Sequence, residues 1–96
     1  MLTADEIVAA CRSHRPELQA MGVRRLGLFG SFARGDARED SDMDFLVELD
    51  SMSFDRFMDV KLFLEDLFGR RVDLVPFDRI KPRIRAAILS EVVDAA

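Results

Sequence analysis

The sequence contains no tryptophan, no tyrosine and only one cysteine, Cys11, among its 96 residues. A lone cysteine cannot close an intramolecular disulfide, which favours a reducing, cytoplasmic location. Cys11 falls within a helical pattern, where a small buried residue is expected. The eight phenylalanines occur at helix and strand spacing, which indicates core packing and not a base-stacking surface.

Long apolar runs and an excess of basic residues are also missing. No apolar run approaches the about 20 residues that span a bilayer, and the start "MLTADEIVAAC" lacks the basic stretch and cleavage site of a secretory signal. The net charge of −4 argues against broad binding to nucleic acid. Basic residues do gather in 69–71 and 79–85, which predicts either a solvated face or a rim that receives phosphates or an acidic partner.

The length and the order of elements predict one α/β (α+β) domain over residues 1–96. A capping box of Thr3 and Glu6 indicates the first helix, and Pro16 suits the first turn of a second. We expect a small mixed sheet of about three strands flanked by helices. The expected strands are 23–30, 42–49 and 71–77, and the later helices are a short one after Gly30, a long one over 53–68 and an amphipathic one over 82–93.

Two aspartates, Asp42 and Asp44, stand at the front of an apolar strand. Side chains alternate along a strand, so both point to the same side. The helical crossover over 53–68 predicts a parallel third strand, in which Asp73 has a matching early position. Three carboxylates at one sheet edge repel each other unless a cation is present, and Mg²⁺ prefers oxygen ligands. The alternative is that the aspartates are solvent-facing residues at a strand start.

A glycine–serine pair precedes these aspartates in "GSFARG". Gly30 permits a tight turn and close approach of a ligand, while the amides and hydroxyl at Ser31 suit a phosphate. Arg34 either steadies this loop or meets a phosphate, and Gly35 closes the short helix. The pair is not a Walker A loop, because Gly35 is followed by Asp36 and alanine, and not by lysine and a hydroxyl residue.

The combination of Gly30-Ser31, Ala33-Arg34-Gly35, Ser41-Asp42-x-Asp44 and the distant Asp73 resembles the signature of the polymerase-β-type nucleotidyltransferase superfamily. The short chain resembles its minimal nucleotidyltransferase branch, often encoded as the antitoxin beside a HEPN-type ribonuclease toxin. The resemblance covers essentially the whole chain and implies a polymerase-β-like nucleotidyltransferase fold.

The resemblance also implies residue roles and an activity. Gly30, Ser31 and Arg34 would bind the nucleotide, and Asp42, Asp44 and Asp73 would be the catalytic ligands of two Mg²⁺ ions. The implied reaction transfers AMP from ATP to a hydroxyl, that of a tyrosine of a HEPN-type toxin, with release of pyrophosphate. Two alternatives stay open: an antitoxin that acts by binding and occlusion without catalysis, and a small-molecule transferase of the antibiotic-modifying kind.

Overall fold

The sheet of the protein has four strands in the order β3–β2–β1–β4, as seen in a computed structural model that describes residues 2–96. Its strands are β1 (Val23–Phe29), β2 (Met43–Leu49), β3 (Val72–Pro76) and β4 (Val93–Asp94). The helices are α1 (Ala4–Ser13), α2 (Arg15–Ala20), α3 (Ser31–Arg34), α4 (Phe54–Phe68), the 3-10 turn η1 (Phe77–Arg79) and α5 (Pro82–Glu91). The mixed α/β arrangement confirms the predicted fold class.

Local signals in the sequence set most helix ends. The predicted capping box forms at α1, where the Thr3 hydroxyl accepts from the Glu6 amide and the Glu6 carboxylate accepts from the Thr3 amide. Ser53 caps α4 through the Arg56 amide, and Gly69 ends that helix in the left-handed conformation at φ 64°. These caps satisfy amides and carbonyls that a helix end otherwise leaves unpaired.

The pairing of the strands places the front of β2 beside the front of β3. β1 runs antiparallel to β2, so the end of β1 meets the start of β2, with Phe29 opposite Asp44. β2 and β3 are parallel and connected through α4, as the length of the crossover predicted. The end of β1 and the starts of β2 and β3 therefore lie at the same edge of the sheet.

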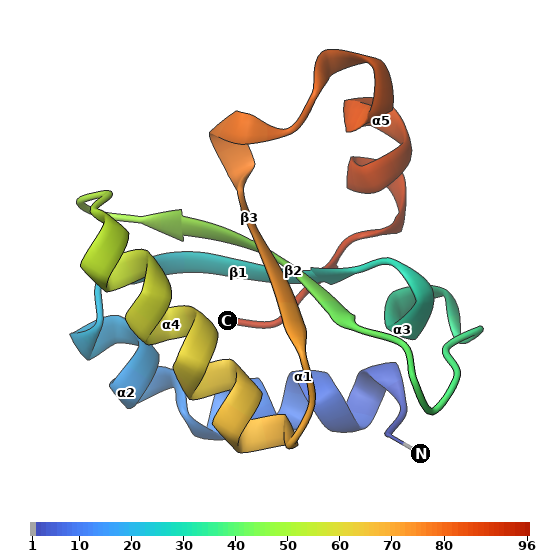
Figure 1. Ribbon diagram of the computed structural model, residues 1–96, viewed down its shortest axis with the longest axis horizontal. Helices are drawn as coiled ribbons and strands as arrows, with labels where there is room; N and C mark the ends of the chain where they lie inside the picture. The colour runs from blue at the N-terminus through green and yellow to red at the C-terminus, as the bar shows by residue number, and fades with distance from the viewer. Residues whose placement is uncertain (1) are drawn as a thin grey trace.

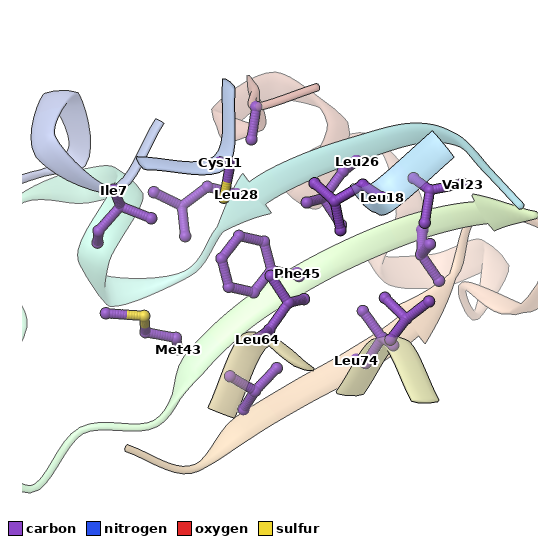
Figure 2. Close-up of a cluster of buried hydrophobic side chains, with 14 of the residues drawn as sticks. Ile7, Cys11, Leu18, Val23, Leu26, Leu28, Met43, Phe45, Leu64 and Leu74 are labelled. Carbon is purple, nitrogen blue, oxygen red and sulfur yellow. The ribbon is translucent and has the colours of Figure 1, made fainter. Parts of the chain in front are cut away.

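The core lies between one face of the sheet and helices α1, α2 and α4, which gather below the strands in Figure 1. Phe45 of β2 is fully buried at its centre, with Leu28 of β1 and Leu64 of α4 close by (Figure 2). Cys11 is also fully buried, as predicted, and burial raises the pKa of its thiol to about 12. This one-sided core leaves the opposite face available to polar side chains such as Asp44.

The C-terminal segment differs from the expectation in two ways. The last helix, α5, ends at Glu91 and not at residue 93, and none of its residues is buried. Val93 and Asp94 form a short fourth strand on the edge of β1, so the expected count of about three strands was close. α5 lies on the opposite side of the sheet from α1, α2 and α4 (Figure 1). None of the helices in residues 2–96 is long and apolar enough to cross a membrane.

Candidate active site

The glycine–serine turn connects the end of β1 to α3. Gly30 has φ 77° and ψ −155°, a conformation that is essentially reserved for glycine. A Cβ atom at Gly30 would overlap the Asp44 carboxylate, lying only 2.9 Å from its Cγ atom. Glycine is thus required here both by the backbone and by the close approach of Asp44. Ser31 then begins α3, and Gly35 ends it at φ 84°.

The three predicted aspartates are brought to the same edge of the sheet. Asp44 lies in β2 and is the direct Cα partner of Asp73 in the parallel register. Asp42 immediately precedes β2, which begins at Met43 and not at the predicted residue 42, and its charge acts on Asp44. Asp42 and Asp73 are exposed, whereas Asp44 is half-buried beside Gly30. The three residues therefore lie at one edge of the sheet, and this edge opens toward solvent.

Negative charge dominates the electrostatics of this edge. The pKa of Asp44 is raised from 3.8 to about 6, first by burial and then by the charges of Asp73 and Asp42. Glu91 adds to this effect, and Arg34 opposes it. No side chain of residues 2–96 forms an ion pair with any of the three aspartates. A cation bound here would relieve the repulsion and favour ionised Asp44.

The donor set of this edge suits Mg²⁺ in chemistry, although the protein side chains do not complete a coordination shell. Between Leu2 and the C-terminus, no three acidic, histidine or cysteine side chains converge tightly enough to hold an ion. Mg²⁺ commonly keeps several waters and substrate phosphates while one or two carboxylates anchor it. Asp42 and Asp44 suit the role of such anchoring carboxylates, and Asp73 lies alongside them.

Arg34 makes two ion pairs that the sequence did not reveal. Its Nε atom lies 3.2 Å from Asp36 Oδ2, and its Nη1 atom lies 3.1 Å from Glu91 Oε2. These carboxylates raise the pKa of Arg34, so the guanidinium stays charged. Glu91 also accepts a hydrogen bond of 3.0 Å from the Gly30 amide. Glu91 was missed because it follows a basic stretch 61 residues after Gly30 in the chain, and no motif connects the two.

Arg70 supports the connector that leads into Asp42. Its Nη1 atom donates to the carbonyl oxygens of Ser41 at 2.8 Å and Glu39 at 3.1 Å. Its guanidinium also lies over the ring of Phe32, which is buried and belongs to the core. An open depression of about 350 Å³ lies beside the connector, lined by Glu39, Asp40, Ser41, Asp42, Arg70 and Arg71. Arg70 thereby fixes the approach to Asp42 and brings positive charge near it.

A larger depression lies elsewhere on the molecule. It measures about 450 Å³ and is lined by Met52, Ser53, Phe54, Phe57, Pro76 and Arg79. These residues lie at the far ends of β2 and β3, whereas the aspartates lie at the fronts of the same strands. The volume of a depression therefore does not locate the site. The position of the aspartates beside the glycine turn locates it.

Known proteins resemble this chain along most of its length. Residues 11–95 match the Nucleotidyltransferase domain family. The chain is 44% identical over 95 residues to the protein adenylyltransferase MntA of Thermococcus cleftensis, covering 97% of this chain and 96% of that one. A solved structure assigned as a minimal nucleotidyltransferase is 35% identical, with a TM-score of 0.80, over 96% of this chain and 95% of that one.

A more distant structure shares the fold. It is the complex of a tri-AMPylated HEPN toxin of Shewanella oneidensis with its MNT antitoxin, with a TM-score of 0.65 at 14% identity. The match covers 92% of this chain and 70% of that chain. The family match, the relative at 44% identity and the structure at 35% identity show the family of this protein. The chain belongs to the nucleotidyltransferase domain family, among the minimal nucleotidyltransferases related to MntA.

Proposed function

We propose that the protein is an antitoxin that transfers AMP from ATP to a hydroxyl of a HEPN-type toxin, with Mg²⁺ as cofactor. The observation that carries the proposal is the register of the sheet, which sets Asp44 beside Asp73 and next to the Gly30 turn. The adenylyltransferase name of the Thermococcus relative, at 44% identity, supports the choice of AMP as the transferred group. A cytoplasmic location, where ATP and Mg²⁺ are available, is part of the proposal.

The proposed roles follow from the positions of the side chains. Gly30 and Ser31 receive the triphosphate through backbone amides and the hydroxyl, and Arg34 contributes positive charge. Asp42, Asp44 and Asp73 would together hold two Mg²⁺ ions. When bound, the ions stabilise charge on the attacking and leaving oxygens of an in-line displacement. Asp44 is half-buried and its pKa is raised to about 6, so a cation bound beside it would favour its ionised form.

The bonds made and broken in this reaction balance without a further reactant. The acceptor oxygen forms a bond to the α-phosphorus of ATP, and the bond from that phosphorus to the bridging oxygen of the β-phosphate breaks. Pyrophosphate leaves, and the hydroxyl proton passes to solvent or to a nearby carboxylate. We propose tyrosine as the acceptor on the toxin. The chain has no tyrosine of its own, so such an acceptor lies on the partner.

The test is transfer of label from ATP to a purified HEPN-type partner. Label on the α-phosphate should reach the partner in the presence of Mg²⁺, and label on the γ-phosphate should not. Asp44→Asn should abolish transfer, whereas Asp40→Asn, which removes one exposed charge from the nearby connector, should retain it. Transfer by the Asp44→Asn variant, or transfer of the γ-label, would contradict the proposed reaction.

A second candidate function is neutralisation by binding alone. α5 has no buried residue and exposes Ile84 and Leu89, at 43% and 39% of their surface, so it offers apolar area for a partner. On this alternative the Asp44→Asn variant still protects cells from the toxin. Loss of protection in a variant that is folded and still binds the toxin assigns neutralisation to the transfer.

A further inference from the structure

The carboxylate of Glu91 lies on the same donors that the proposed function assigns to the phosphates of the nucleotide. Glu91 Oε1 accepts from the Gly30 amide at 3.0 Å and from Arg34 Nη1 at 3.3 Å, and Oε2 accepts from Arg34 Nη1 at 3.1 Å. An anionic group with two oxygens on an amide and a guanidinium has the contact pattern of a bound phosphate. The side chain is 23% exposed, so it is held against the turn and not free in solvent.

The position of Glu91 in the fold lets it occupy this place and also leave it. Glu91 is the last residue of α5, just before β4, which pairs with β1 through Gly27 and Leu28. This pairing keeps the backbone of Glu91 near the end of β1. The helix before it has no buried residue, so the packing of α5 does not fix the side chain. A rotation of the Glu91 side chain is therefore sufficient to release the Gly30 amide.

We infer that Glu91 is a resident competitor for the phosphate-binding donors of the Gly30 turn and that a nucleotide must displace it to bind. The inference rests on the proposed function, because it takes Gly30 and Arg34 as the donors for phosphate. Glu91 then lowers the affinity for nucleotide, and it adds a fourth carboxylate to the acidic edge formed by Asp42, Asp44 and Asp73. Nucleotide then binds only with enough divalent cation to offset the negative charge of these carboxylates. Glu91 is thereby a residue that sets the affinity for nucleotide.

The first test compares binding of a non-hydrolysable ATP analogue with Mg²⁺ to three proteins by calorimetry. Glu91→Gln removes the competing charge but keeps a similar shape, and should bind the analogue roughly fivefold to tenfold more tightly, because a charged hydrogen bond is about twice as strong as a neutral one. The matched control is Asp36→Asn, which removes the other carboxylate on Arg34 but leaves the Gly30 amide occupied. Its affinity should change by less than about twofold, since Asp36 forms an exposed pair.

The second test uses the unaltered protein and does not depend on how a variant folds. Titration with inorganic tripolyphosphate and Mg²⁺ should shift the NMR signals of both the Gly30 amide and the Glu91 side-chain carboxyl carbon, because one anion replaces the other. A shift at Gly30 without any change at Glu91 would overturn the inference.

The outcomes separate the inference from the function on which it rests. If the unaltered protein binds the analogue and Glu91→Gln binds it equally or more weakly, Glu91 is not a competitor, and the inference fails while the proposed function stands. If neither protein binds the analogue, the proposed function fails and the inference fails with it.

Discussion

Replacement of Gly30 by alanine should be the most damaging single change at the site that leaves the protein folded. The backbone at φ 77° and ψ −155° costs a residue with a Cβ about 1–3 kcal/mol. The added methyl group would also meet the half-buried Asp44 carboxylate, with the Asp44 Cγ at 2.9 Å and Cβ at 3.1 Å, and this overlap adds about 1–2 kcal/mol. We expect a total of about 3 kcal/mol and a melting temperature lower by about 15 °C.

Gly35 provides the matched control for this change. It has a similar φ of 84°, but no atom of the described chain lies within 4 Å of a Cβ built there. Gly35→Ala should cost about 1 kcal/mol from the backbone alone, or about 5 °C in melting temperature. The difference between the two substitutions contains the overlap with Asp44 and the extra backbone cost at Gly30, where ψ is −155° against 15° at Gly35.

Thermal and urea unfolding followed by circular dichroism would measure both costs, with Gly30→Ala repeated in an Asp44→Ala background. There the overlap is reduced, and Gly30→Ala should cost about 1 kcal/mol less than in the unaltered protein. Equal destabilisation by the two glycine substitutions, or a cost at Gly30 that does not depend on Asp44, would refute the close approach of Gly30 and Asp44.

Asp44→Asn should stabilise the protein at pH 7.5 by about 1 kcal/mol, a value reduced for solvent screening. Because the pKa of Asp44 is higher folded than unfolded, its charge weakens the fold as pH rises from about 4 to about 6, so the gain should vanish in unfolding measured at pH 4. Mg²⁺ at 10 mM should raise the melting temperature of the unaltered protein by several degrees, and the double variant Asp42→Asn/Asp44→Asn should not show this rise. An equal rise in the two proteins would show that the cation binds elsewhere. The thiol of Cys11 should resist iodoacetamide in the folded protein and react only in denaturant, because it is buried with a raised pKa. Glu65→Gln should cost about 1–2 kcal/mol in urea unfolding, because the Glu65 carboxylate accepts from both Lys61 and the Val72 amide at the start of β3; no loss would show that this contact does not hold β3.

The aspartate edge could be predicted from the sequence because it depends on local rules. Alternation along β2 puts Asp42 and Asp44 on one side, and a helical crossover makes the next strand parallel. These two rules bring Asp73 opposite Asp44 without any knowledge of the core. The glycine turn was predictable for the same reason, since Gly30 and Gly35 mark its two ends.

The C-terminal segment could not be predicted in the same way. β4 has only two residues, Val93 and Asp94, and it exists because the edge of β1 supplies its hydrogen bonds. The contact of Glu91 with Gly30 depends on where that pairing sets the end of α5, and no spacing in the sequence encodes it. The pattern of α5 predicted an amphipathic helix, but none of its residues is buried against the part of the chain that the structure describes.

We propose that this protein transfers AMP to a partner by means of the Asp44 edge. The most direct measurement is the intact mass of a HEPN-type partner produced together with this protein and, separately, with its Asp44→Asn variant. We predict a mass increase of one or more AMP units with the unaltered protein and no increase with the variant. A partner that co-purifies with both forms and keeps its unmodified mass in both would contradict the claim.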